Sequence, residues 1–190
     1  MARWEPGARE RLVIAAVDLF TEQGYDATTV AQIAERAGVT KSTFFRHFPD
    51  KREVLAASQD TLSRLLTEGI AGAPPEATPL EAVAAGLEKA AGAMGELQRE
   101  HVPRVQAAIA ASAELQERDA LKIVGLAVAM TDALVARGVP EVVAHLASEV
   151  GVIAFKRGFA QWSAADAAGD LAHHALTALA ELRAAGAALG

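Results

Sequence analysis

The segment "TTVAQIAERAGVTKSTFFRHFPDK", residues 28–51, decides the fold of the first part of the chain. Its first half predicts a short helix, because Thr29 is a good N-cap and a glutamine stands three residues later, as a capping box requires. Gly38 then ends this helix, and Thr40 is the expected N-cap of another one. Pro49 stops the second helix after barely two turns. Two short helices joined by a tight turn indicate a helix-turn-helix.

The second of these helices has two different faces. At about 100° per residue, Phe44 and Phe48 share one side and are expected to be buried. Ser42, Thr43 and Arg46 lie on the opposite side. This arrangement suits a recognition helix, since short polar groups let the backbone enter the major groove and an arginine can read guanine. The alternative is an ordinary amphipathic surface helix.

The composition of the whole chain favours an all-α fold. Hydrophobic residues make up 52% of the 190 residues and aromatic residues only 5%, so the core must consist mostly of Ala, Leu and Val. Alanine and leucine are among the strongest helix formers. Periodicity and Pro/Gly punctuation predict about nine helices: an initial one, the two short ones, and others over about 51–70, 79–100, 104–116, 119–137, 141–162 and 166–185. Pro103 is expected to separate two of them.

The expected organisation is a three-helix DNA-binding domain at residues 1–52, followed by a larger helical effector-binding and dimerisation domain at 53–190. The charge supports this division. The net charge is -6, yet the first 52 residues hold eight basic against seven acidic residues, and the rest holds ten against seventeen. Between Arg36 and Arg52 the ratio is five to one. A local DNA-contacting surface is therefore compatible with an acidic protein, although these charges can also merely solvate a helix pair.

The compartment follows from what the sequence lacks. There is no cysteine, which excludes disulfides and thiolate metal sites. The first residues are polar and charged, so no signal peptide is visible. No apolar run approaches the roughly 18 residues of a membrane span. We expect a cytoplasmic protein without membrane contact.

The region from about Arg9 to Leu55 resembles the DNA-binding region of the TetR family of bacterial repressors. The matching elements are "IA" at 33–34, "AGV" at 37–39, the "TKST" start of the second helix, "HF" at 47–48, and Lys51. The C-terminal part resembles the family in architecture alone. The resemblance implies that the DNA-facing residues are Thr29, Thr40, Lys41, Ser42, Thr43, Phe45, Arg46, His47 and Lys51.

One residue departs from the family pattern. Phe45 stands where the family usually has a tyrosine, whose hydroxyl binds a phosphate. Phenylalanine keeps the apolar contact but cannot make that hydrogen bond. Weaker anchoring to the DNA backbone is expected, with more reliance on His47 and Lys51.

The resemblance also implies a small-molecule effector and a homodimer. An apolar ligand is preferred, since such ligands bind between helices in largely apolar pockets. These side chains can line that pocket or equally belong to the core: Met94, Leu97, His101, Met130, Phe155 and Phe159. Neighbouring His173 and His174 point about 100° apart and share no helix face, so neither a metal site nor a cofactor is expected.

The family's last two helices usually form a four-helix bundle with the partner subunit. The apolar residues that can supply this bundle are Val142, Leu146, Val150, Ile153, Leu171, Ala175, Ala178 and Leu179. An intramolecular core is the alternative for each of them.

The function that these observations favour is a ligand-responsive transcriptional repressor bound to a palindromic operator. Its two recognition helices must lie about 34 Å apart, or a multiple of that distance, to read one face of B-DNA. The chain contains no phosphate loop, no zinc-protease motif and no nucleophile elbow, so an enzyme is not expected. A helical interaction or adaptor protein is the remaining alternative, but it would not need the Ser42, Thr43 and Arg46 face.

Overall fold

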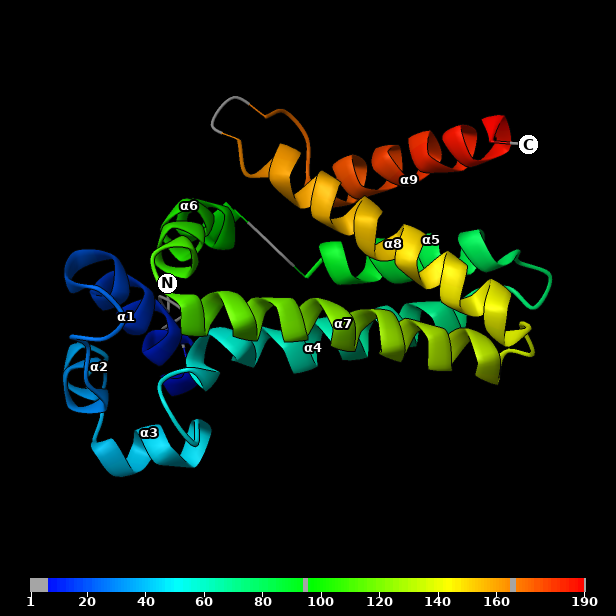
Figure 1. Cartoon of the computed structure of the whole chain (residues 1–190). Coiled ribbons are helices and arrows are strands. Elements are labelled where there is room, and N and C mark those ends of the chain that lie inside the picture. Colours follow the sequence, from blue (N-terminus) through cyan, green and yellow to red (C-terminus); the bar gives the residue numbers. More distant parts are fainter. Residues whose placement is uncertain (1–6, 94–95, 165–166, 190) are drawn as a thin grey trace, which may run out of the picture. The chain divides into compact units, whose positions relative to one another are not determined.

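The computed structural model describes residues 7–93, 96–164 and 167–189, without the side chains of 55–60, 96–98, 100 and 101. Within these ranges the chain forms nine α-helices and no strand, which confirms the predicted all-α class (Figure 1). The helices are α1 (Ala8–Gln23), α2 (Val30–Arg36), α3 (Lys41–His47), α4 (Glu53–Gly72), α5 (Pro79–Ala91), α6 (Glu96–Ala110), α7 (Ala113–Ala136), α8 (Glu141–Trp162) and α9 (Leu171–Ala188).

The helices group into two compact units. The N-terminal unit combines the described residues of 1–58 with 100–120, and the C-terminal unit combines those of 59–99 with 121–190. Helices α4 and α7 therefore each begin in the first unit and end in the second. The boundary predicted after residue 52 does not coincide with the limits of these packing units. The assignment of functions to its two sides stays a prediction.

The expected helix break at Pro103 is wrong. The proline lies inside α6, and the break that was expected there falls between Ala91 and Glu96. The next break, expected at residues 117–118, falls at 111–112. There the Oγ atom of Ser112 accepts a hydrogen bond from the backbone N–H of Leu115 at 3.4 Å, which caps the start of α7. A proline inside a helix costs about 3 kcal/mol. Burial of Val102 and Ala108 on the same helix offsets that cost, and this packing is invisible to a local rule.

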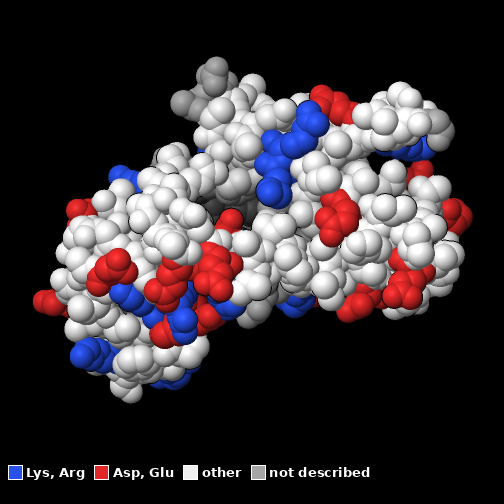
Figure 2. All heavy atoms as spheres, in the orientation of Figure 1, with Lys and Arg blue, Asp and Glu red and all other residues white. Residues whose placement is uncertain are grey.

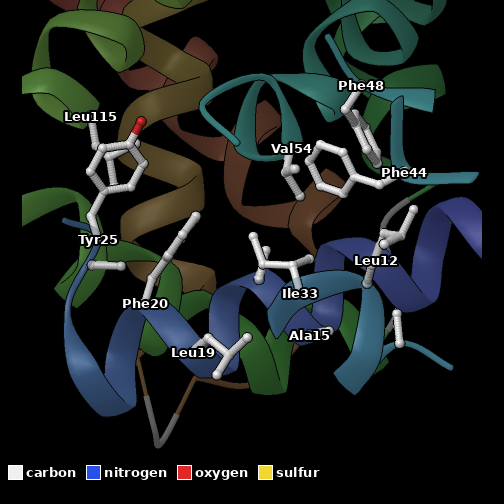
Figure 3. Close-up of a cluster of buried hydrophobic side chains, with 14 residues drawn as sticks. Leu12, Ala15, Leu19, Phe20, Tyr25, Ile33, Phe44, Phe48, Val54 and Leu115 are labelled. Atoms are coloured by element: carbon white, nitrogen blue, oxygen red, sulfur yellow. The ribbon is translucent and has the colours of Figure 1, made fainter. Parts of the chain in front are cut away.

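The core of the N-terminal unit confirms the predicted inner face of α3. Phe44 and Phe48 are buried, with ring centroids 5.6 Å apart, and they belong to one cluster with Leu12, Ile33 and Val54 (Figure 3). Residues from α6 and α7 complete the same cluster. Helix α3 is therefore held on its inner side by side chains from several other helices.

Glycines bring the helices of the C-terminal unit into close contact. A Cβ atom on Gly158 of α8 would lie 2.5 Å from the backbone of Ala175 on α9. A Cβ on Gly69 of α4 would lie 2.6 Å from the Cα atom of Gly86 on α5. Such contacts leave no space for a side chain, so these helices pack backbone to backbone, as their small residues predict. None of the helices in the described ranges has the length and apolarity that crossing a membrane requires.

Candidate nucleic-acid interface

The turn between α2 and α3 is built by local capping, as predicted. Thr29 and Gln32 form the full capping box: the Thr29 N–H donates to Gln32 Oε1 at 2.8 Å, and the Gln32 N–H donates to Thr29 Oγ1 at 3.3 Å. Gly38 adopts a φ of 68°, which favours glycine, and the N–H of Val39 donates to the carbonyl of Ala34 at 2.9 Å. The sequence alone therefore predicts this turn.

Helix α1 fixes the same turn through a contact that the sequence did not reveal. The Nε atom of Arg11 donates to the carbonyl oxygen of Ala37 at 3.1 Å. Ala37 is the last residue before the turn glycine, so this bond holds the end of α2 against α1. The two partners are 26 residues apart, and no spacing rule connects them.

The outer face of α3 is open to solvent. Lys41, Ser42, Phe45 and Arg46 are exposed, and the Phe45 ring packs edge-on against the ring of buried Phe44. At the start of the helix, the hydroxyls of Thr40 and Thr43 lie 3.0 Å apart, and the Thr43 N–H donates to Thr40 Oγ1 at 3.1 Å. The predicted cap is confirmed.

His47 is only half-exposed, and its Nε2 atom is buried without a hydrogen-bond partner among the described residues. A DNA contact from this ring must therefore use its Nδ1 atom or follow a rotation of the side chain. The assignment of His47 to the DNA backbone stays a prediction.

Two of the five basic residues between positions 36 and 52 are bound to acidic side chains of the same unit. The guanidinium of Arg36 donates to both carboxylate oxygens of Glu22, at 3.1 and 2.9 Å, which holds the pKa of Glu22 below its usual value. Arg52 donates to Asp50 at 2.7 Å, and this bond is the main cause of the lowered pKa of Asp50. Both arginines are thus partly neutralised by their neighbours.

Lys51 is held inside the unit as well, by uncharged groups. Its Nζ atom donates to the backbone carbonyls of Tyr25 at 2.7 Å and of Thr28 at 3.1 Å, and it lies 4.0 Å from the centroid of the Tyr25 ring. Thr28 immediately precedes the predicted phosphate ligand Thr29. In this structure Lys51 therefore positions the loop before α2, while a phosphate contact from it stays a prediction.

Tyr25 connects this loop to the start of α7. Its hydroxyl donates to Glu114 Oε1 at 3.2 Å. Burial raises the pKa of Tyr25, and the nearby negative charge of Glu114 adds to the effect. The α1–α2 loop is thus held by Lys51 on one side and by Glu114 on the other.

The charged face of α3 consequently depends on Lys41 and Arg46, which are both exposed. Figure 2 shows basic side chains at the end of the N-terminal unit that carries α3, while the acidic side chains visible on this unit gather elsewhere. The structure brings the predicted DNA-facing residues together around α3 and the start of α2, and it divides them into exposed and internally bonded groups.

Three of the six predicted effector residues are described with their side chains, and the role of all six in ligand binding stays a prediction. Met94 lies outside the described residues, and the side chains of Leu97 and His101 are not described. Met130 is buried, and its methyl carbon lies 2.7 Å from the position that a Cβ atom on Gly151 would take. Phe155 is buried too and stacks on half-exposed Phe159, with centroids 6.0 Å apart.

A groove of about 400 Å³ lies elsewhere in the C-terminal unit, between α5 and α9. Apolar side chains such as Leu80, Leu176 and Ala180 line it together with Glu81 and Arg183. The three predicted effector residues with described side chains, Met130, Phe155 and Phe159, are not among its lining residues. The groove is partly open to solvent rather than fully enclosed. In the described part of the chain, no group of three or more His, Cys, Asp or Glu side chains is arranged to hold a metal ion.

The predicted dimer residues divide by helix. On α8, Val142, Leu146 and Ile153 are exposed and Val150 is half-exposed. On α9, all four predicted residues are buried within the subunit: Leu171, Ala175, Ala178 and Leu179. In this subunit the α9 residues follow the alternative of an intramolecular core, because α9 packs against α8 and α5 through that face.

This arrangement of α1, α2 and α3 has clear counterparts among known proteins. Residues 12–58 match the family model described as bacterial regulatory proteins, tetR family. The match covers most of α1, all of α2 and α3, and the start of α4. One relative, the HTH-type transcriptional regulator TcmR of Streptomyces glaucescens, is 36% identical over 92 residues, which is 47% of this chain and 41% of TcmR.

Several solved structures share the fold over most of the chain. SmeT, the repressor of a multidrug efflux pump of Stenotrophomonas maltophilia, matches in its triclosan complex with a TM-score of 0.61 and 21% identity, over 94% of this chain and 90% of SmeT. NalD, the secondary repressor of a Pseudomonas aeruginosa efflux pump, matches with a TM-score of 0.56 and 23% identity, over 92% and 96%. At these identities the likeness shows the fold alone. The chain spans less than half the length of the curated relatives it matches.

Proposed function

We propose that this chain is one subunit of a homodimeric transcriptional regulator whose α3 reads the major groove of a palindromic operator. The observation that carries the proposal is the two-sidedness of α3. Phe44 and Phe48 are buried at its back, while Lys41, Ser42 and Arg46 are exposed on its front. A rigid helix with short polar groups and one long donor on its outer side is what base reading needs.

The exposed residues divide between two roles in this proposal. Arg46 reads a base, since a guanidinium can bond both acceptors of guanine in the major groove. Lys41 and the hydroxyls of Thr29 and Thr40 bind phosphates, which sets the register of the protein on DNA without reading sequence. Fewer basic residues are open to DNA than the sequence suggests, because Arg36 and Arg52 are paired.

The proposed regulation is repression that a small apolar molecule relieves. It is supported by two proteins with this fold: SmeT and NalD are repressors of efflux pumps, and SmeT has been solved with triclosan. A ligand shifts the protein toward a state that does not fit DNA only if it binds that state more tightly. Helices α4 and α7 can carry the change, since each runs from one unit into the other.

The test of DNA reading is selection of binding sites from a random DNA library, followed by affinity measurements on the selected site. We expect the wild type to select a palindrome, and Arg46→Ala to lower affinity by about 1–3 kcal/mol while relaxing selectivity at one position of each half-site. Arg36→Ala is the matched control, because it removes the same charge from an arginine already bound to Glu22. Unchanged selectivity in Arg46→Ala would contradict the proposal.

The test of regulation is a thermal-shift screen with small apolar compounds, triclosan included as a probe. Compounds that raise the melting temperature are then added to the complex with DNA. We expect at least one of them to release the operator. If every stabilising compound leaves the complex intact, the chain is a DNA-binding protein that small apolar molecules do not control.

A further inference from the structure

The start of α7 lies in the N-terminal unit, beyond the residues that the family model matches. That match ends at residue 58, whereas residues 113–120 of α7 belong to the same compact unit as α1, α2 and α3. Leu115 is buried there, in one hydrophobic cluster with Phe20 and Tyr25 (Figure 3). The first turns of α7 are therefore packed into the helix-turn-helix unit, although they come much later in the chain.

Glu114, which precedes Leu115, holds two segments of this unit. Its Oε1 atom accepts a hydrogen bond from the hydroxyl of Tyr25 at 3.2 Å and lies 3.4 Å from the Nε atom of Arg52. Tyr25 belongs to the loop between α1 and α2, and Arg52 belongs to the turn between α3 and α4. One carboxylate thus connects the segment before α2 with the segment that follows α3.

Arg118 makes a third contact, one helical turn further along α7. Its Nη2 atom donates to the carboxylate of Glu53, the first residue of α4, at 2.7 Å. Glu114 and Arg118 are four residues apart, so they share one face of α7. The ion pair is partly shielded from water, since 36% of the Arg118 side chain and 29% of the Glu53 side chain are exposed. Salt therefore screens it less than a fully exposed pair.

These contacts reach the proposed phosphate ligand Thr29 through the α1–α2 loop. The hydroxyl of Tyr25 carries the contact with Glu114, and the backbone carbonyl of Tyr25 accepts a hydrogen bond from Lys51. The same lysine binds the carbonyl of Thr28, which directly precedes Thr29. A short series of bonds therefore runs from α7 to the N-cap of α2.

We propose that Glu114 and Arg118 are positioning residues for DNA binding, which fix the α1–α2 loop and the start of α4 and thereby place Thr29 on the phosphate backbone. This inference rests on the DNA binding proposed above, and it adds two residues of α7 that lie far outside the matched region. Neither side chain touches DNA: Glu114 acts through Tyr25 and Arg118 acts through the start of α4. The alternative is that both contacts only stabilise the fold.

The sign of the change in DNA affinity tests Glu114. DNA is a polyanion, so the loss of a carboxylate from the DNA-binding unit strengthens binding if charge alone matters. We expect the opposite: Glu114→Ala weakens binding to the selected operator about five- to tenfold and leaves the salt slope unchanged, because Thr29 carries no charge. Glu117→Ala is the matched control, since Glu117 is exposed on the same helix. It should bind as tightly as the wild type or slightly more tightly.

A second variant tests the contact from the other side. Tyr25→Phe keeps the ring in the core and removes only the hydroxyl that Glu114 binds. We expect this variant to weaken operator binding by a similar factor. It should add little to the effect of Glu114→Ala in the double variant, because both changes remove the same contact. Fully additive losses would overturn the role of this contact.

A charge swap tests Arg118. Arg118→Glu places two carboxylates against each other at the start of α4, and we expect it to weaken operator binding. Combining it with Glu53→Arg restores a pair of opposite charges and the net charge of the wild type, so affinity should return to within about twofold of the wild type. A swap that binds as weakly as Arg118→Glu alone would overturn the positioning role of Arg118.

Hydrogen exchange in the free protein supplies a readout that needs no DNA. Glu114→Ala should speed the exchange of the amides of residues 24–32 and leave the amides of the other helices protected, whereas Glu117→Ala should change neither. A general loss of protection would make the contacts merely structural and overturn the inference. Arg46→Ala is the reference for the DNA assay. If it weakens operator binding and Glu114→Ala does not, the inference alone fails; if neither weakens it, the reading role of α3 fails.

Discussion

Replacing Lys51 by methionine separates two roles that the sequence and the structure assign to it. The family resemblance makes Lys51 a phosphate ligand. In the structure its ammonium group donates to the carbonyls of Tyr25 and Thr28 and lies 4.0 Å from the Tyr25 ring centroid. Methionine keeps the apolar stem and removes the charge and the donors.

The expected loss of stability follows from these contacts. A hydrogen bond from a charged donor contributes about 1.5–3 kcal/mol, and a cation over an aromatic ring adds about 0.5–2 kcal/mol. Lys51 is half-exposed, so water replaces part of each contact. We expect Lys51→Met to lower the free energy of unfolding by about 2–3 kcal/mol, measured by urea denaturation with circular dichroism.

DNA binding distinguishes the two roles, because each lost phosphate contact reduces the salt dependence of affinity. The slope of log K against log salt changes by about 0.9 for each contact. If Lys51 positions the loop before Thr29, Lys51→Met weakens operator binding but leaves this slope unchanged. Lys41→Met is the matched control: Lys41 is exposed on α3, and its loss should reduce the slope by about 0.9 per subunit. The reasoning fails if Lys51→Met reduces the slope as Lys41→Met does and leaves stability unchanged.

Three further substitutions test the site and the fold. Phe45→Tyr should raise operator affinity a few-fold at low salt by restoring a hydroxyl for phosphate, and an equal or lower affinity in a filter-binding titration would contradict the role of this position. Gly158→Val should lower the free energy of unfolding by about 1–3 kcal/mol in a thermal denaturation experiment, because its Cβ would lie 2.5 Å from the α9 backbone. Gly186→Ala is the control: no atom lies within 4 Å of its Cβ, so this variant should be as stable as the wild type or more stable. Asp50→Asn should make the free energy of unfolding less dependent on pH in the acid range. The pKa of Asp50 is lowered below its usual 3.8 in the folded protein, so the carboxylate contributes its full stabilisation above pH 3.8 and loses it as the pH falls through the folded pKa. An unfolding midpoint with the same pH profile below pH 5 in both proteins would count against that role.

Local interactions explain what the sequence predicted correctly. Thr29 and Thr40 cap helices through partners three residues away, so their roles can be read from spacing alone. The burial of Phe44 and Phe48 likewise follows from the helical period. The all-α class depends on the same short-range preferences, summed over many residues.

Long-range packing decided the rest. Local rules place a helix break at Pro103, but buried neighbours on α6 keep the helix continuous. From composition alone, Arg36 and Lys51 are expected to be available to DNA. In the structure each is bound to a partner 14 or at least 23 residues away in sequence, which local rules cannot identify.

The same distinction applies to the surface of the C-terminal unit. A helical stripe of apolar residues predicts that some side is buried, but not which neighbour covers it. By itself the sequence determined the helical class, the caps of α2 and α3 and the exposed polar face of α3, because those depend on residues a turn apart. Only the tertiary structure decided which cations stay open to DNA and which apolar faces of α8 and α9 remain uncovered, because those depend on contacts between distant segments.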